Sequence, residues 1–288
     1  MSTPHTPDAV RHPTADELRA EALAWARKPR RYGSWYVTEH MVRTMRAYGW
    51  TIVVGALGQP ILYLLGLGLG LAALIQGQID DGGRPVPYLV FIAPALLVTA
   101  AVGVASEEFT YPVMSGFKWR RYFYGFNASP LSSAQIVNGV VLGASARMFV
   151  GVAAYYLFIW LFGAVPETAT GWLSILVGLL AGVSFGAPLM AFAASLEEDK
   201  GQFALVQRFV FVPMFLFSGT FYPLATLPWF LQLIGWVSPL WHATEVSRML
   251  TYGPFEPLLA LGHLAYLLAL AVGGYLLARR IFERRLAA

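Results

Sequence analysis

The 288-residue sequence contains no cysteine and few charged residues. The missing cysteine excludes disulfides, thiolate nucleophiles and cysteine-ligated zinc sites. Charged residues make up only 12% of the chain, against about 25% in ordinary soluble domains, while hydrophobic residues make up 57%. The sequence also lacks a G-x-x-x-x-G-K-[ST] pattern, so this chain cannot hold ATP phosphates in a P-loop. We expect an all-α integral membrane protein that binds no cofactor and no metal of its own.

Long charge-free windows divide the sequence into membrane spans, since one spanning helix needs about 20 apolar residues. We expect six transmembrane helices, at about residues 49–75, 86–106, 134–162, 172–195, 203–218 and 257–279. Placing both termini in the cytoplasm puts the Lys and Arg residues on the cytoplasmic side, apart from Arg84, Arg147, Arg208 and Arg248. This distribution satisfies the positive-inside rule and predicts a multi-pass protein of the cytoplasmic (inner) membrane.

The first 47 residues are polar and precede the predicted six-helix domain at 48–288. Residues 1–33 contain several prolines and a basic cluster at 27–31. They predict a flexible cytoplasmic arm with one possible helix near Thr14 to Ala26, and the basic cluster is expected to contact lipid headgroups. Nothing else in the chain supports a nucleic-acid partner. Residues 34–47 place apolar side chains at helical spacing, which predicts an amphipathic helix in the membrane interface. The alternative is that these residues are the first turns of span one, protruding from the bilayer.

The loop at 107–133 combines basic and aromatic side chains in one short stretch. Its centre holds Phe117, Lys118, Trp119, Arg120 and Arg121. Arginine beside aromatic residues is a typical docking anchor for a protein partner. The alternative is an ordinary positive-inside loop with interfacial aromatic residues.

The chain's most unusual stretch is charge-free from Phe209 to Thr244 and interrupted by helix breakers. It is too long for one span, so we expect span five to be followed by short re-entrant helices in an outer segment, 219–250. The residues expected to shape that segment are Gly219, Pro223, Pro228, Pro239, His242, Glu245 and Arg248. His242 and Glu245 have the spacing of two metal ligands but lack a third, so hydrogen bonds or an ion pair with Arg248 are the preferred interpretation.

Two arginines lie within predicted spans, where an ionisable side chain usually faces a partner or a water-filled cavity. We expect Arg147 to line a transport path or to pair across a subunit interface. Arg208 follows it in the path or extends its side chain to the cytoplasmic interface. The aromatic residues expected to line the outer part of that path are Phe221, Tyr222, Trp229 and Trp236.

The outer segment carries a resemblance spread over about thirty residues. Ser218-Gly219, Tyr222-Pro223, Leu227-Pro228-Trp229, Ser238-Pro239-Leu240, His242, Glu245 and Arg248 resemble the C-terminal signature of ABC-2 type transporter permeases, in the NodJ-like and daunorubicin-resistance-like branch. Residues 59–66 in span one and 127–132 before span three are also similar to that branch. The resemblance covers roughly 35–285.

The resemblance implies the permease subunit of an ATP-driven exporter, without enzymatic activity of its own. It implies two copies of an ABC ATPase that bind ATP and Mg, a second and identical permease chain, and a large amphipathic cargo such as a glycolipid, lipo-oligosaccharide, polysaccharide or drug. The ATPase would dock on the loop at 107–133. One alternative is an integral-membrane enzyme that acts on lipid-linked sugars at the outer face, with His242, Glu245 and Arg248 as its site; another is a non-catalytic membrane scaffold.

Overall fold

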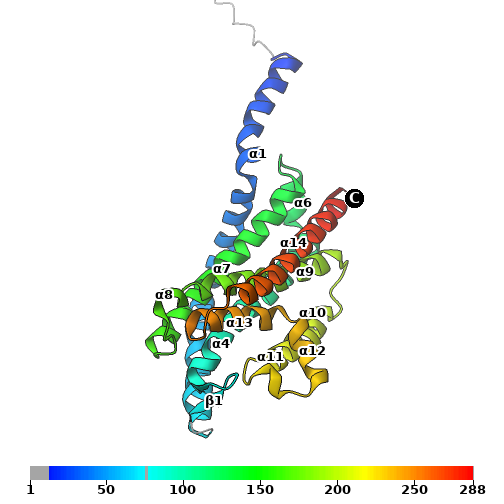
Figure 1. Ribbon diagram of the computed structural model, residues 1–288. Helices are drawn as coiled ribbons and strands as arrows, with labels where there is room; N and C mark the ends of the chain where they lie inside the picture. The colour runs from blue at the N-terminus through cyan, green and yellow to red at the C-terminus, as the bar shows by residue number, and fades with distance from the viewer. Residues whose placement is uncertain (1–12, 75–76, 288) are drawn as a thin grey trace, which may run out of the picture.

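The computed structural model describes residues 13–74 and 77–287, and most of them are helical (Figure 1). The helices, with η marking 3₁₀ and π turns, are α1 (Ala15–Met45), η1 (Arg46–Tyr48), α2 (Gly49–Tyr63), η2 (Leu64–Leu71), α3 (Ala72–Leu74), α4 (Tyr88–Glu108), α5 (Tyr111–Met114), η3 (Ser115–Trp119), α6 (Tyr122–Asn127), α7 (Ser133–Leu161), α8 (Thr168–Gly171), α9 (Ser174–Ser195), α10 (Gln202–Val206), η4 (Gln207–Phe211), α11 (Val212–Phe217), η5 (Leu224–Thr226), α12 (Trp229–Val237), α13 (Pro239–Thr251) and α14 (Pro257–Ala287). Two short strands, β1 (Gln78–Asp80) and β2 (Pro85–Pro87), form an antiparallel hairpin. The predicted all-α class is confirmed.

Five helices in the described part of the chain are long and apolar enough to cross a membrane. They are Ala15–Gly68, Tyr88–Trp119, Ser133–Leu161, Thr168–Ser195 and Pro257–Ala287. Each overlaps one of the six predicted spans. The sixth predicted span, 203–218, falls on a shorter apolar helix, Gln202–Phe217, which is interrupted by the π turn η4. The count of six and the re-entrant character of the outer segment therefore stay predictions.

The N-terminal segment differs from its predicted form. A continuous helix runs from Ala15 to Gly68; it includes the possible helix near Thr14 to Ala26 and extends it through residues 27–33, and residues 1–12 lie outside the described part. Thr14 begins this helix with a capping box: its hydroxyl accepts a hydrogen bond from the Glu17 N–H (3.3 Å), and the Glu17 carboxylate accepts one from the Thr14 N–H (2.8 Å). A proline in the helix interior removes one hydrogen bond, and Pro29 is accommodated here within α1. Figure 1 shows the first turns of α1 projecting beyond the other helices.

The second half of α1 packs against the first half of α7. Its buried residues Val37, Met41 and Met45 recur every four positions and face α7. The backbones approach closely at Gly139, where a Cβ atom would collide with Val37, and Thr38 Oγ1 donates a hydrogen bond to the Gly139 carbonyl (3.3 Å). Residues 34–47 thus continue the helix of the first span, which is the alternative to a separate interfacial helix.

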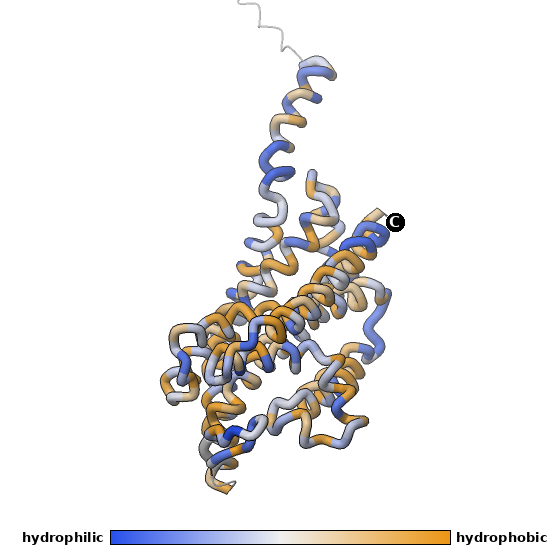
Figure 2. The backbone as a smooth tube through the Cα atoms, in the orientation of Figure 1, coloured by the Kyte–Doolittle hydropathy of each residue, from blue (hydrophilic) through white to orange (hydrophobic). Residues whose placement is uncertain are grey.

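One end of the bundle collects basic residues and is called here the basic end: residues 109–133, 196–202 and 279–287. Lys118 and Glu198 form an ion pair there (3.2 Å). Arg285 donates hydrogen bonds to two carbonyl groups at the C-terminal end of α9 (2.7 Å each). Figure 2 shows hydrophilic residues concentrated at this end and on the projecting part of α1, with hydrophobic residues through the bundle.

The opposite end, called the hairpin end, is formed by residues 77–88, 162–173, 218–228 and 248–257. Tyr88 donates to the Phe221 carbonyl (3.2 Å), and Tyr252 donates to the Asp81 carboxylate (2.9 Å). The residues before Gln202 lie at the basic end and those after Phe217 at the hairpin end. The segment Gln202–Phe217 therefore runs along the bundle from one end to the other.

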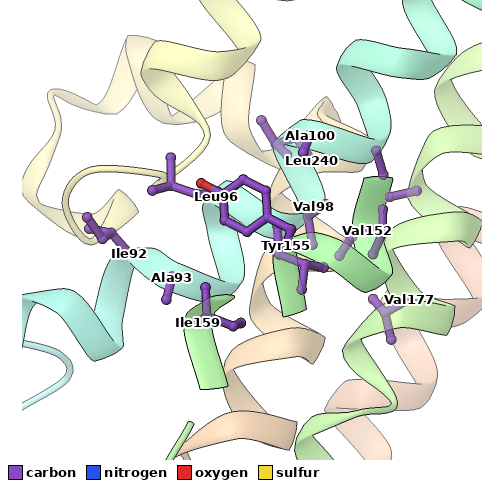
Figure 3. Close-up of a cluster of buried hydrophobic side chains, with 14 of the residues drawn as sticks. Ile92, Ala93, Leu96, Val98, Ala100, Val152, Tyr155, Ile159, Val177 and Leu240 are labelled. Carbon is purple, nitrogen blue, oxygen red and sulfur yellow. The ribbon is translucent and has the colours of Figure 1, made fainter. Parts of the chain in front are cut away.

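The core is built around α4, most of whose residues are buried. α4 packs against α7, α9 and α13, and Figure 3 shows Ile92, Leu96 and Val98 of α4 beside Tyr155 and Ile159 of α7. Glycine allows α9 and α14 to cross closely, since a Cβ atom on Gly274 of α14 would collide with Pro188 of α9. Small residues at such crossings are typical of packed membrane helices.

Candidate functional site

A cavity of about 630 Å³ lies in the basic half of the bundle, between α2, the end of α4, the middle of α7 and the segment α10–η4. Its walls carry hydroxyl, amide and charged side chains within an otherwise apolar domain. The polar lining residues are Thr51, Gln59, Ser106, Glu107, Thr110, Tyr111, Arg147, Tyr155, Gln207 and Arg208. In the part of the chain that the structure describes, this is where both intramembrane arginines of the sequence meet.

Arg147 enters the cavity from the middle of α7 and is held by two carboxylates of α4. Its Nη2 lies 2.8 Å from Glu107 Oε2, and its Nη1 contacts Glu108 Oε1. The Glu108 side chain is only 2% exposed, whereas that of Glu107 is 65% exposed. A buried carboxylate without a partner would be costly, so Arg147 is what allows Glu108 to be ionised there. Arg147 thus lines the cavity as expected, but the ion partners that the structure gives it belong to its own chain.

Sequence reasoning missed Glu107 and Glu108. Both follow a charge-free window directly, so they read as the first residues of a loop. In the structure they are the last two residues of α4, and the turn at Phe109–Thr110, α5 and η3 follow them. The sequence signal that points to them is the need of an intramembrane arginine for an acidic partner.

Arg208 lies on the opposite wall, on η4, with its side chain exposed. Ala204, Gln207, Arg208 and Phe211 line the cavity at the spacing of one helix face. Gln207 is fixed by Ser106 of α4, whose hydroxyl donates to Gln207 Oε1 (2.9 Å). The wall opposite α7 is therefore tied to α4 by a polar contact.

Tyr155 adds a buried hydroxyl that has no hydrogen-bond partner. Its residue is 1% exposed, and it stands among apolar side chains of α4 and α7 (Figure 3). A buried hydroxyl without a partner costs free energy, so such groups often mark the place of a ligand or water. Because Tyr155 also lines the cavity, its hydroxyl is a candidate contact for a bound molecule.

A row of aromatic rings leads from the cavity towards the hairpin end. Phe211 lines the cavity and stacks on Phe215 (6.4 Å between centroids), which meets Phe221 edge to face (4.9 Å). Of the four outer aromatic residues predicted for the path, Phe221 is thus connected to the cavity through ring contacts.

The other three outer aromatic residues lie elsewhere. Tyr222 donates to the Leu216 carbonyl (2.8 Å), and Trp229 and Trp236 are 73% and 48% exposed on α12. None of the three lines the cavity. The side chains of Trp229 and Trp236 project from the amphipathic helix α12, which is typical of a membrane interface.

Arg248 organises the outer segment from its buried position on α13. Its guanidinium donates to the Gly219 carbonyl (2.7 Å), pairs with Glu245 (3.0 Å) and covers the Phe91 ring at 3.7 Å. Gly219 adopts a φ of 72°, which glycine accepts without strain. Pro223, Pro228 and Pro239 stand at the starts of η5, α12 and α13, where their missing N–H groups cost nothing.

His242 is not part of that cluster. Its Nδ1 lies 2.8 Å from Nδ1 of His263 on α14, and its Nε2 lies 2.9 Å from the Trp236 carbonyl. Burial lowers the pKa of His242. The expected ion pair between Glu245 and Arg248 is therefore present, while His242 contacts His263 and the Trp236 carbonyl instead of these two side chains. Among the described residues there is also no group of three acidic, His or Cys side chains placed to hold a metal ion.

The predicted docking residues divide into buried and exposed members. Phe117 is buried against Phe123 and Phe282 and lies under the Arg285 guanidinium, so its side chain cannot dock a partner directly. Trp119 is 55% exposed and stacks on Tyr111. The loop also contains a buried tyrosine, Tyr122, which donates to the Pro112 carbonyl (2.6 Å) and whose pKa is raised by burial.

The remaining docking residues carry the charge. Lys118 pairs with Glu198, while Arg120 is exposed. Arg121 has a φ of 56°, which turns the chain between η3 and α6, and its guanidinium lies over the Tyr124 ring. The exposed surface of this loop is therefore formed by Lys118, Trp119, Arg120 and Arg121.

Comparison with known proteins decides the family. The profile described as ABC-2 type transporter matches residues 35–252, about three quarters of the chain. The chain belongs to the ABC-2 type transporter family. This confirms the resemblance found in the outer segment and makes the protein a transporter permease, a class that generally works with an ABC ATPase subunit.

Individual relatives agree with the family. The chain is 27% identical over 241 residues to Nodulation protein J of Rhizobium meliloti strain 1021, covering 81% of this chain and 86% of the relative. It is 28% identical over 270 residues to Nodulation protein J of Bradyrhizobium diazoefficiens, covering 85% and 97%. It is also 29% identical over 213 residues to the Inner membrane transport permease YadH of Escherichia coli K12, covering 69% and 74%.

Proposed function

We propose that this chain is the membrane subunit of an ATP-driven exporter that moves a large amphipathic molecule out across the cytoplasmic membrane. The observation that carries the proposal is a cavity with charged and hydroxyl side chains in its walls, within an apolar helical domain, with a row of aromatic rings leading from it. A polar lining accommodates the head of an amphiphile, and the aromatic row accommodates its apolar part. Glycolipids, lipo-oligosaccharides, polysaccharides and drugs have this chemistry.

The energy for export comes from a separate ATPase in this proposal. Two copies of that subunit bind ATP and Mg and dock on the exposed residues of the loop at 107–133, with Lys118, Trp119, Arg120 and Arg121 as contacts. A second, identical permease chain completes the transporter. The position of the loop directly after α4 supports the docking assignment, because only the turn at Phe109–Thr110, α5 and η3 lie between the cavity-lining Glu107 and Trp119.

The proposed topology has six spans with both termini in the cytoplasm. Gln202–Phe217 serves as the fifth span, and residues 219–250 form the re-entrant outer segment. The arrangement is supported by the Lys118–Glu198 ion pair at the basic end and the Arg248–Gly219 hydrogen bond at the hairpin end. These contacts hold the two flanks of Gln202–Phe217 at opposite ends.

Photo-cross-linking in native cells tests the cargo path and captures a cargo of any identity. A benzoyl-phenylalanine would replace Gln207, which lines the cavity, or Leu268, which is exposed on the outside of α14. Mass spectrometry of the adducts should find an amphiphile at Gln207 that is absent at Leu268, where bulk phospholipid is expected. Identical adducts at the two positions would contradict a transport role for the cavity.

A second experiment tests the ATPase partner. The full chain would be purified in mild detergent, and co-purifying proteins would be identified by mass spectrometry. We expect a P-loop ATPase that is lost when Trp119→Ala is combined with Arg120→Glu, and retained in the control Arg43→Gln. Arg43 is an exposed arginine of α1 outside the docking loop. Absence of an ATPase from the unmodified chain would argue against the exporter.

A further inference from the structure

A second cavity of about 510 Å³ lies beside the first, nearer the basic end. It is formed between the second half of α1 and the segment at 108–122, and its lining is mostly apolar. Met41, Met45, Pro112 and Trp119 contribute to its walls, and Arg120 and Glu108 are its charged groups. It is called here the inner cavity, and the cavity of Arg147 the membrane cavity.

The two cavities share one wall. Tyr111 lines both of them. Glu107 and Arg147 line the membrane cavity, while Glu108 lines the inner cavity, and the bonds from Arg147 to both carboxylates close the space between. This group, Glu107, Glu108 and Arg147, is called the clasp. It joins α4 to α7 at the point where the two cavities meet.

The clasp has properties that a permanent wall does not need. Two carboxylates share one guanidinium, so the ionised group carries a net charge of −1 within the membrane domain. Apolar side chains would close the same gap without the cost of desolvating three charged groups. A group of ion pairs can instead rearrange. Each carboxylate keeps a favourable interaction if another cation takes the place of Arg147.

Alternative partners are present on both sides. Arg208 lines the membrane cavity with Glu107, and Arg120 lines the inner cavity with Glu108. In an open state in which α4 and α7 separate, Arg208 would be the cation offered to Glu107 and Arg120 the cation offered to Glu108. The closed state holds both carboxylates on Arg147, and the open state distributes them over Arg208 and Arg120. Neither state leaves a buried carboxylate without a cation.

We propose that the clasp, together with Tyr111, is a gate between two halves of one internal path, and that an amphiphile entering from the basic end occupies the inner cavity before the gate opens. The inference rests on the proposed transport function and adds to it an entrance and its gating residues. The apolar lining of the inner cavity fits the acyl or other apolar part of such a molecule. The clasp carboxylates of α4 are separated from η3 only by the turn at Phe109–Thr110 and by α5, so the docking loop directly follows the gate along the chain.

The absence of cysteine makes the gate measurable by thiol labelling. Ser106 lines the membrane cavity and Ser115 the inner cavity, so Ser106→Cys and Ser115→Cys report on the two sides of the gate. The thiol at 106 replaces the hydroxyl that donates to Gln207 in every background that is compared. The full chain with its ATPase would be labelled in inside-out vesicles by a membrane-impermeant maleimide. With the clasp intact, the cysteine at position 115 should react about tenfold faster than that at 106, since an open minor state is populated at about 10% or less.

Loosening the clasp should change only one of these rates. In a Glu107→Gln, Glu108→Gln background we expect labelling at 106 to rise about tenfold, as an open state of about 10% becomes the major one, while labelling at 115 stays constant. The matched control is Arg43→Gln with Glu39→Gln, which removes an exposed ion pair on α1 outside the docking loop and should alter neither rate. Equal labelling at 106 with and without the clasp would overturn the gate, and so would a rise in the control.

If the double glutamine variant does not fold, the unmodified clasp still provides a test. Labelling at 106 would be compared between the nucleotide-free and the vanadate-trapped transporter, and a gate requires the two rates to differ. Identical rates would overturn the proposal. The labelling requires no cargo, so a negative result contradicts the gate alone. The proposed export function is tested separately by the cross-linking experiment.

Discussion

Replacing Arg248 by methionine should destabilise the protein more than any exposed charge substitution. Methionine keeps the apolar stem of the side chain but removes the guanidinium. The Arg248 side chain is only 5% exposed. The change breaks the bond to the Gly219 carbonyl (2.7 Å), the ion pair with Glu245 (3.0 Å) and the contact with the Phe91 ring (3.7 Å). Breaking a buried ion pair by removing one partner costs about 3–5 kcal/mol.

That loss of free energy has a measurable thermal equivalent. At about 2–4 °C per kcal/mol for a chain of this size class, the apparent Tm should fall by about 10 °C. The assay is the fraction of folded protein that survives heating in detergent, measured by fluorescence-detected gel filtration. Glu245→Gln should cost less, because the Glu245 side chain is 29% exposed and its amide can still accept a hydrogen bond.

The control for this prediction is Arg43→Met, which removes an exposed arginine paired with Glu39 on the same helix face. Such pairs contribute about 0.3–0.5 kcal/mol, so the Tm should move by only about 1–2 °C. If Arg248→Met shifts the Tm no more than Arg43→Met does, Arg248 does not hold the outer segment, and the assignment fails.

Two further predictions concern the crossing of α9 with α14 and the histidine of the outer segment. Gly274→Ala should cost about 1–3 kcal/mol, because its Cβ collides with Pro188, whereas Gly273→Ala meets open space and should leave the Tm unchanged. Burial lowers the pKa of His242 below 6.5 in the folded protein, so the unfolded chain binds more protons as the pH falls. The free energy of unfolding is therefore highest above pH 6.5 and decreases as the pH falls below it. Thermal unfolding at pH 7 and pH 5 should show this loss, and His242→Asn should reduce the slope; an unchanged slope would contradict it.

Hydropathy alone is enough to predict the elements that depend on burial in a membrane. The helices α4, α9 and α14 overlap long charge-free windows, and α7 overlaps a long apolar window whose one charged residue is Arg147, because a span requires mainly apolar length. The interruptions of the outer segment are also readable, since Pro223, Pro228 and Pro239 begin new elements in the structure. In these cases a local chemical rule determines the local structure.

The first helix shows where local rules compete. Pro29 and the polar composition of residues 1–33 indicate a loose arm, but the Thr14–Glu17 capping box starts a helix that passes through Pro29. Packing of the following turns on α7 stabilises this helix, and a contact between residues about a hundred positions apart leaves no periodic trace in the sequence.

The candidate site could be predicted only in part for the same reason. An intramembrane charge identified Arg147, but its partners Glu107 and Glu108 lie 40 and 39 positions away. The burial of Phe117 depends on Phe282 of α14, and the partner of His242 is likewise on α14. A residue type and its spacing indicate that a partner is needed, and only the packing of distant helices determines which one it is.

The π turn η4 has a consequence for comparing this chain with its relatives. A π turn accommodates one residue more than an α-helical turn, so the faces of α10 and α11 are offset by about 100° relative to a regular helix. A relative with a regular helix here should align with a gap of one residue within 207–211. In such a relative, the side chain that corresponds to Phe215 would point to a different neighbour, and the aromatic row towards Phe221 would be broken unless another ring replaced it.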